Sequence, residues 1–252
     1  AHFSMSDLAT IESAFYCSCD SEAVQGGLLS VDAALRKGLA LAKTVDEMEQ
    51  LPLEAAHGRV LGQAIQTKTP RMIADEPELL RQALENAAQK ADLVVTTGGV
   101  SVGDEDHMPA MLAAAGGVLD VIKVAMKPGK PLTIGHLGNA VYIGLPGNPV
   151  SAFVTWHVIG ARIAEKLAGL AISVPERNFV RASFARTRQP GRCEFLPATL
   201  GRQDGHGLRN VEIATASVSH RVALLAQADG LVLIPAETDE IKPGDLLEFL
   251  PF

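Results

Sequence analysis

Apolar residues recur at helical spacing in several segments of the chain, and short apolar runs rich in β-branched residues lie between them. The helical segments begin near Val31, Pro77, Met108 and Val150. The apolar runs cover residues 92–97, 118–126, 132–134 and 140–144. Helices that alternate with apolar strands are typical of α/β folds, so we expect a doubly wound, mostly parallel sheet.

The helical period ends near residue 171, and the remaining chain carries short runs of alternating polarity. These runs cover residues 179–182, 194–198, 231–234 and 246–249. Turn residues such as Lys242-Pro243-Gly244-Asp245 separate them, which predicts a small all-β domain. The changes in pattern divide the chain into a tail, a helix-containing segment, an α/β domain and the β domain, at residues 1–27, 28–70, 71–170 and 171–252.

Composition and charge exclude several classes of function. The 252 residues carry a net charge of −7, whereas a protein whose main partner is nucleic acid usually has a broad basic face. No apolar run reaches the roughly 18 residues that span a bilayer, and the first residues lack the pattern of a secretion signal. We therefore expect a cytoplasmic protein without a nucleic-acid or membrane partner. Three cysteines are too few for a disulfide framework.

A Gly-rich loop, Thr97-Gly98-Gly99-Val100-Ser101-Val102-Gly103, follows the run at 92–97 directly. Glycines allow positive φ and leave no Cβ in the way of a ligand, so consecutive backbone N–H groups can point at an anion. Ligands of open α/β sheets bind at the carboxyl ends of the strands, where this loop lies. We expect it to hold an anionic, phosphate-bearing ligand; the alternative is a tight turn that binds nothing.

Acidic residues Asp104-Glu105-Asp106 come directly after this loop. Carboxylates beside an anion site make chemical sense if a divalent cation bridges them to phosphate, as Mg²⁺ does with hard oxygen ligands. Asp106 is the preferred ligand. Capping of the following helix is the alternative, above all for Asp104.

Three lysines lie close together in the chain at residues 123, 127 and 130. If the run from 118 to 126 is one strand that continues to Lys127, then Lys123 and Lys127 share a face at period two, and Lys130 follows a Pro-Gly turn. Such a group of cations would hold phosphate or another oxyanion, for which the ammonium acts as a point charge. The alternative for each lysine is a solvated surface position.

A second loop, Gly144-Leu145-Pro146-Gly147-Asn148-Pro149-Val150-Ser151, joins a strand to the helix predicted from residue 150. The dipole and the free N–H groups of a helix N-terminus attract anions. The two prolines make the loop rigid, so little entropy is lost when a ligand binds. A stiff structural elbow is the alternative interpretation.

Taken in this order and spacing, the Gly-rich loop with its acidic run, the segment Lys127-Pro128-Gly129-Lys130-Pro131 and the loop 144–151 resemble the MoeA family of molybdopterin molybdenumtransferases, which is similar to the E domain of gephyrin. The resemblance extends over residues 28–65 and over residues 171–252. It implies a molybdopterin-binding α/β domain followed by a small barrel-like all-β domain, with residues 28–70 as a helix and a fragment of a linking domain.

The resemblance also implies a reaction. The family inserts molybdenum from molybdate into adenylylated molybdopterin, which releases AMP and forms molybdenum cofactor, with Mg²⁺ or a similar cation required and with a homodimer as the assembly. By resemblance, Asp75 and Asp106 are the functional acidic residues near metal or substrate, and Lys123 and Lys127 hold anionic substrate. The residues expected to line the cofactor site are Gly98, Gly99, Ser101, Gly103, Lys130, Pro146, Gly147, Asn148, Pro149 and Ser151.

One departure from the family pattern is large. Between the positions of Pro70 and Asp75 the family has a long stretch with an acidic motif, an inserted domain and the first strand of the α/β domain, and that stretch is missing here. Either the chain is a truncated form, or residues are omitted after Pro70. We favour the second, because an α/β domain without its first strand would expose a sheet edge. An intact mass near 26.6 kDa would contradict the omission, and one near about 40 kDa would support it.

Two other functions stay open at this point. One is a non-catalytic molybdopterin-binding or scaffold module, which would bind the pterin without turnover. The other is the related molybdopterin adenylyltransferase step on the same α/β fold. The appended β domain and the Lys-Pro-Gly-Lys-Pro segment favour the molybdenum transferase over the adenylyltransferase by resemblance.

Overall fold

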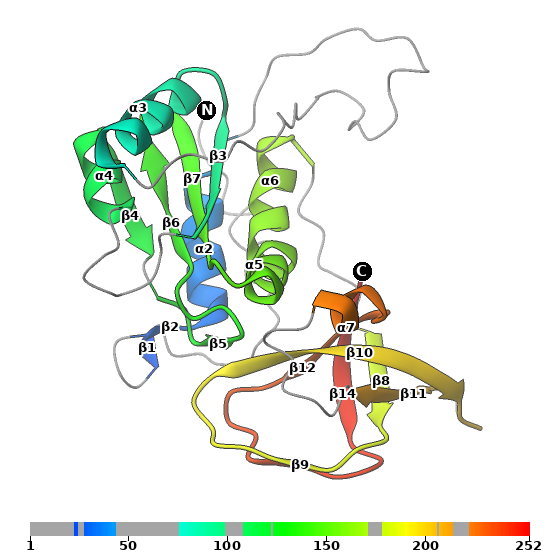
Figure 1. Cartoon of the computed structure of the whole chain (residues 1–252). Coiled ribbons are helices and arrows are strands. Elements are labelled where there is room, and N and C mark those ends of the chain that lie inside the picture. The colour runs from blue at the N-terminus through cyan, green and yellow to red at the C-terminus, as the bar shows by residue number, and fades with distance from the viewer. Residues whose placement is uncertain are drawn as a thin grey trace, which may run out of the picture.

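The computed structural model of the chain describes residues 23–24, 28–43, 76–98, 108–121, 123–170, 178–205, 207–213 and 222–252. These residues form an α/β domain and, from residue 178 onward, a β domain that lies against one end of it (Figure 1). Among them, no helix is long and apolar enough to cross a membrane.

Four described strands form the sheet of the α/β domain, in the order β3-β7-β6-β4. Their bounds are Leu93–Thr97 for β3, Gly117–Val121 for β4, Thr133–Leu137 for β6 and Ala140–Leu145 for β7. Strands β3 and β7 are parallel, whereas the β7–β6 and β6–β4 pairs are antiparallel. The predicted α/β class is confirmed, and the described sheet is mixed where the sequence predicted a mostly parallel one.

The change of strand direction comes from a hairpin between β6 and β7. The register pairs Leu137 with Ala140, so two residues, Gly138 and Asn139, connect the strands. Gly138 has φ +60°, and positive φ at the first position of a two-residue hairpin loop matches the twist of the flanking strands. A connection this short joins antiparallel strands, because parallel neighbours need a crossover of a dozen or more residues. The Gly-Asn pair is the signal that the sequence interpretation missed.

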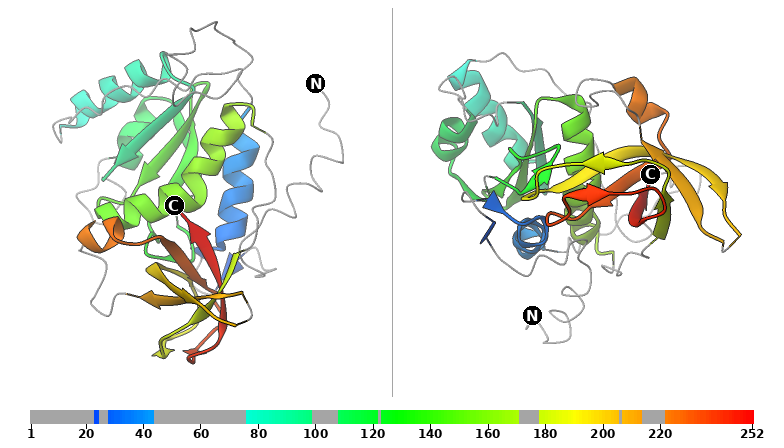
Figure 2. Two further views of the ribbon diagram at one scale, coloured as in Figure 1. Left: turned by 90° about the vertical axis from the view of Figure 1, so that its right-hand side faces the viewer. Right: turned by 90° about the horizontal axis from the view of Figure 1, so that it is seen from below.

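Helices cover both faces of the sheet (Figure 2). Their bounds are Val31–Leu41 for α2, Pro77–Ala88 for α3, Met108–Ala114 for α4, Pro149–Thr155 for α5, Trp156–Gly160 for the π-helical segment η2 and Ala161–Leu167 for α6. The last three follow one another without a break, which confirms the helix predicted from residue 150. The predicted helices from Val31, Pro77 and Met108 are also confirmed.

Alternation along β7 explains why both faces are covered. Val141 and Ile143 pack into the large core with α2, α5 and α6, whereas Ala140 and Tyr142 pack into a second core with α3 and α4. Successive side chains of a strand point to opposite faces of the sheet. Every residue of β7 is buried, as expected for a central strand whose two faces both meet helices.

Helix α2 packs on the sheet beside α6. The hydroxyl of Ser30 accepts a hydrogen bond from the backbone N–H of Ala33 at 3.1 Å, so Ser30 is the N-cap of this helix. The helices cross closely at Gly38, where an added Cβ would lie 2.5 Å from Cδ1 of Ile163. Helix α2 therefore shares the core of the α/β domain; the boundary expected at residue 70 lies outside the described residues.

The strand predicted over residues 118–126 is confirmed in its first part, and its continuation to residue 126 is wrong. Strand β4 ends at Val121, and the backbone around Lys123 instead bonds to the short strand β2, Leu28–Leu29, which pairs with β1, Ala23–Val24. The N–H of Leu29 donates to the carbonyl of Lys123 at 3.2 Å, and the N–H of Ala125 donates to the carbonyl of Leu29 at 2.6 Å. The period-two argument that placed Lys123 and Lys127 on one strand face therefore does not hold.

The β domain is a small barrel. Its main strands are β8, Asn178–Ala182; β10, Cys193–Gln203; β11, Arg209–Ile213; β12, Gly230–Ile234; and β14, Leu246–Pro251. They are ordered β11-β8-β14-β12-β10, and the ring closes because β10 also pairs with β11. A minor pair, β9 (Arg186–Thr187) with β13 (Glu240–Ile241), and a helix, α7 (Val222–Ala226), complete the domain. The predicted barrel-like β domain is confirmed.

The two domains are joined by a strand pairing and by a shared core. Strand β5, Met126–Lys127, leaves the α/β domain and pairs in parallel with β10 of the barrel. On the inside, Phe195 and Leu233 of the barrel belong to the same buried cluster as Met126 and the α/β core. The segment carrying the predicted lysines thus lies at the junction of the domains.

Candidate functional site

The structure describes nine of the fourteen predicted site residues. These are Gly98, Lys123, Lys127, Lys130, Pro146, Gly147, Asn148, Pro149 and Ser151. The other five, Asp75, Gly99, Ser101, Gly103 and Asp106, lie outside the described residues, so their predicted roles stay predictions. Within the described part of the chain, no three His, Cys, Asp or Glu side chains come together in a way that could hold a metal ion.

Two of the predicted loops start side by side. The parallel register pairs Thr97 at the end of β3 with Leu145 at the end of β7. The N–H of Gly98 donates to the carbonyl of Leu145 at 3.1 Å, and a Cβ added at Gly147 would lie 3.4 Å from Cα of Gly98. Gly98 has φ +83°, which a side chain would strain. The carboxyl edge of adjacent parallel strands, where the sequence placed the ligand, is therefore formed.

The helix start after this edge differs from the prediction. The side-chain oxygen of Asn148 accepts hydrogen bonds from the backbone N–H groups of Val150 and Ser151 at 3.0 and 3.1 Å. The backbone carbonyl of Asn148 accepts from the N–H of Ala152. Pro149 carries no N–H. The free N–H groups expected to attract an anion at this terminus are thus already bonded or absent, because the residue that ends the loop is also the helix cap. Direct ligand contacts by Asn148, Pro149 and Ser151 stay predictions.

The Lys-Pro-Gly-Lys-Pro segment forms a tight turn on helix α5. The N–H of Val124 donates to the carbonyl of Lys130 at 2.9 Å, which closes the turn, and the Lys127–Pro128 peptide bond is cis. Gly129 is buried with φ +112°, and an added Cβ would lie 2.2 Å from Cγ2 of Thr155. Only glycine fits that backbone against the helix. The turn therefore presents Lys127 and Lys130 as exposed side chains at the domain junction.

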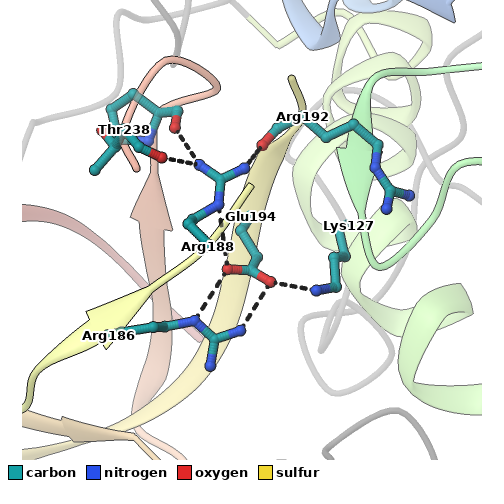
Figure 3. Close-up of polar contacts among 7 residues, drawn as sticks. Lys127, Arg186, Arg188, Arg192, Glu194 and Thr238 are labelled. Carbon is teal, nitrogen blue, oxygen red and sulfur yellow. Dashed lines mark hydrogen bonds and ion pairs between the residues drawn. The ribbon is translucent and has the colours of Figure 1, made fainter. Parts of the chain in front are cut away.

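Lys127 contacts a carboxylate that the sequence did not single out. Its Nζ lies 2.8 Å from Oε1 of Glu194, which is 1% exposed. Arg186 binds the same carboxylate with both ends of its guanidinium, Nη2 to Oε1 at 3.0 Å and Nε to Oε2 at 3.2 Å. Arg188 Nε lies 3.6 Å from Oε2 (Figure 3). We call Lys127, Arg186, Arg188 and Glu194 the Glu194 cluster; its three cations and one carboxylate leave two net positive charges.

The charge state of Glu194 follows from two opposed effects. Burial acts to raise the pKa of its carboxyl, and hydrogen bonds from Lys127 and Arg186 act to lower it; the second effect is stronger, so the pKa lies below its ordinary value. The carboxylate is therefore ionised at neutral pH. An ionised and hydrogen-bonded carboxylate holds its cations in fixed positions.

Arg188 connects this cluster to the rest of the barrel. Its Nη1 donates to the carbonyls of Pro235 and Thr238 at 2.7 and 2.9 Å, and its Nη2 donates to the carbonyl of Arg192. In Figure 3 the Arg192 side chain extends on the side of β10 where Lys127 lies. A carboxylate inside the buried run at 193–198 was the one sequence signal for this cluster, because a buried charge needs a partner. The partners themselves come from separate segments, which no spacing rule joins.

Comparison with known families identifies both domains. Residues 40–166 match the family described as "Probable molybdopterin binding domain", and residues 180–252 match the "MoeA C-terminal region (domain IV)". Among solved structures, the chain resembles a molybdenum cofactor biosynthesis protein from Pyrococcus furiosus with a TM-score of 0.63 at 19% identity, over 89% of this chain and 100% of that one. That likeness concerns the fold.

Curated relatives agree with these matches. The chain is 31% identical over 182 residues to the molybdopterin molybdenumtransferase of Haemophilus influenzae, covering 72% of this chain and 45% of that protein. It is 39% identical over 181 residues to the molybdopterin molybdenumtransferase of a Nostoc species, covering 69% of this chain and 40% of that protein. The chain thus spans less than half the length of these relatives. From its two matched domains and the strand edge and lysine turn they carry, the chain belongs to the MoeA family.

Proposed function

We propose that this protein inserts molybdenum from molybdate into adenylylated molybdopterin, with release of AMP and formation of molybdenum cofactor. The observation that carries the proposal is the presence, in one chain, of the molybdopterin-binding domain and the MoeA C-terminal region, joined where Lys127 meets the barrel. The curated relatives matched over 182 and 181 residues are named for this reaction. An acidic chain with a local group of cations fits anionic substrates, because nearby groups set the local potential.

The described residues suggest how the work is divided. The loops after β3 and β7, which meet at Gly98 and Gly147, would form the floor under the pterin and its phosphates. Lys127 and Lys130 would face the anionic groups from the domain junction. The reaction brings molybdate close to phosphate oxygens, so preorganised cations lower the repulsion between like charges as the new bonds form.

The predicted Mg²⁺ and the predicted homodimer rest on the family resemblance. Asp75 and Asp106, the carboxylates expected to hold the ion, lie outside the described residues. Among the described residues, no group of three or more His, Cys, Asp or Glu side chains could hold a metal ion. We therefore assign no step to Mg²⁺. If it binds at those carboxylates, it would neutralise phosphate charge.

The test is molybdate-dependent release of AMP from adenylylated molybdopterin. Wild-type protein should release AMP, and Lys127→Ala should lower kcat/KM roughly 100-fold, the loss typical when one preorganised donor to a developing charge is removed. Lys242→Ala, which removes an exposed lysine of the barrel paired with Glu240, is the matched control and should keep wild-type activity.

One outcome would replace the proposal with another. If wild-type protein binds molybdopterin and releases no AMP at any molybdate concentration, the chain is a non-catalytic pterin-binding module. Equal activity of Lys127→Ala and wild type would contradict the role given to that lysine.

A further inference from the structure

Glu194 occupies a position where a carboxylate is expensive. It belongs to β10, and its neighbours Cys193 and Phe195 are buried in the core that both domains share. An ionised carboxylate taken out of water destabilises the fold unless cations and hydrogen bonds compensate it. Three cations gather around this one, from β5, from β9 and from the segment after β9. An apolar residue at position 194 would avoid this cost, which points to a role for the charge of Glu194.

The geometry places Lys127 and Glu194 directly opposite each other. The parallel pairing of β5 with β10 puts residue 127 in register with residue 194. Oε1 of Glu194 is shared between Lys127 Nζ at 2.8 Å and Arg186 Nη2 at 3.0 Å. One oxygen therefore separates and holds two cations, one from each domain.

Exposure differs sharply between the two partners. The Glu194 side chain is 1% exposed, whereas the Lys127 side chain is 53% exposed. An ammonium carries three donors on a flexible stem, so it can bond to Glu194 and still meet an anion that arrives from solvent. Without an anchor that stem would sample many rotamers, and anion binding would be weakened by the conformational entropy lost when the side chain is ordered.

We propose that Glu194 is a positioning residue that holds the Lys127 ammonium, at the junction of the two domains, in the place where it meets the anionic substrate. Its effect on substrate passes through Lys127, while Arg186 and Arg188 fix the carboxylate itself. The inference rests on the proposed function, since it assigns Lys127 to the molybdate or phosphate group of that reaction.

Electrostatics and positioning make opposite predictions for removal of the charge. Glu194→Gln keeps the shape and raises the net charge of the cluster from two to three, so attraction alone would strengthen binding of an anion. Loss of the anchor would weaken it, because the lysine must be ordered on each binding event. We expect the second effect to win, so that Glu194→Gln lowers kcat/KM for molybdate about tenfold, mainly through a higher KM.

A double-mutant cycle separates positioning from a general structural role. The variants are Lys127→Ala, Glu194→Gln and both together, assayed by AMP release. If Glu194 acts through Lys127, the double variant should be no slower than Lys127→Ala, within about twofold. Additive losses, or an unchanged or improved KM in Glu194→Gln, would overturn the inference while leaving the proposed function standing.

Asp204→Asn is the matched control for loss of an ion pair in the barrel. Asp204 follows the opposite end of β10 from residue 194 and binds Arg181 Nε at 2.7 Å, so its variant should keep the wild-type KM for molybdate. Melting temperatures of all variants show whether the fold is intact. A loss of activity in Asp204→Asn equal to that in Glu194→Gln would mean that the barrel, not the lysine, is affected.

A readout without turnover keeps the inference testable if Glu194→Gln fails to fold or if wild-type protein releases no AMP. In protein labelled with ¹⁵N at lysine Nζ, the ammonium of Lys127 should give a resonance protected by its hydrogen bond, assigned by its loss in Lys127→Arg. Molybdate should shift this resonance. Its absence, or its indifference to molybdate, would overturn the inference; a shift without AMP release would refute only the proposed function.

Discussion

Single residues at the domain junction take their roles from their partners. Lys127 was expected from the sequence to hold an anion, and the structure adds the carboxylate of Glu194 at 2.8 Å. Glu194 stands in a buried run, where a charge is tolerated only when it is paired. Because Glu194 is buried, a cation is expected opposite it, and the fold supplies three.

His157 is a second residue whose partner comes from far along the chain. Its ring stacks on Phe153 with centroids 5.9 Å apart, and Phe252 meets it edge-on at 5.3 Å. Its Nε2 lies 3.1 Å from the carbonyl oxygen of Pro251. No local sequence pattern joins residue 157 to residues 251 and 252, so only the fold brings them together.

We predict that His157 makes the protein less stable in mild acid. Burial lowers its pKa below the ordinary 6.5, and this outweighs the raising effect of the hydrogen bond with Pro251. The unfolded chain then binds the proton more readily, so the stabilisation is complete above the unfolded pKa and falls as pH drops toward the folded one. His157→Gln should flatten the dependence of unfolding free energy on pH between 7 and 5.5, measured in urea.

The reference for that comparison is the same pair of proteins at pH 8. At that pH His157 is neutral in both the folded and the unfolded chain, so the difference in unfolding free energy between the two proteins reports packing alone. If wild type and His157→Gln lose the same stability between pH 7 and 5.5, the histidine is not the group responsible.

At the scale of elements, a turn and a helix depend on each other. The Lys-Pro-Gly-Lys-Pro turn reaches its position because Gly129 packs against Thr155 of α5. Thr155 is itself held within the helix, with its hydroxyl donating to the carbonyl of Ser151 at 2.8 Å. The helix therefore sets where the lysines are displayed.

We predict that Gly129→Ala destabilises the protein by about 2–4 kcal/mol, because the new methyl overlaps Thr155 and the backbone has positive φ. The measurement is urea unfolding followed by circular dichroism. Gly205→Ala is the control, since nothing lies within 4 Å of a Cβ added there and its φ is ordinary. A Gly129→Ala variant as stable as the Gly205→Ala variant would show that the turn is not packed on α5.

At the scale of the whole molecule, the two domains form one core. Phe195 of the barrel is 0% exposed and belongs to the cluster that includes Met126 and the α5–α6 stretch. A continuous core couples the unfolding of its parts, so we expect the domains to unfold in one transition.

Phe195→Ala should therefore lower the free energy of unfolding by about 3–5 kcal/mol, the usual cost of deleting a buried aromatic ring. The fluorescence of Trp156, the single tryptophan, reports on the α/β domain, and far-ultraviolet circular dichroism reports on both. The two signals should shift together. Leu246→Ala, at a side chain 56% exposed on β14, should change stability little. A Trp156 transition that stays in place while the dichroism shifts would contradict the shared core.

Local signals were enough for the elements and the fold class. The apolar stripes of the helices and the turn-bounded runs of the barrel each depend on neighbours within a few residues, and both are confirmed. The motifs at 97–103, 127–131 and 144–151 were also enough for the family, because glycines and prolines in fixed order restrict the backbone directly.

Those local signals could not predict contacts between segments that are distant in the chain. The direction of β6 relative to β7, the pairing of β5 with the barrel and the gathering of Lys127, Arg186 and Arg188 around Glu194 all depend on which segments meet after the chain has folded. Periodicity describes which face of an element is apolar and carries no information about its partner. The chemistry of single residues was thus visible along the chain, and the geometry that lets them act together came from the tertiary structure, because their charges depend on one another only where the fold brings them around the one buried carboxylate of Glu194.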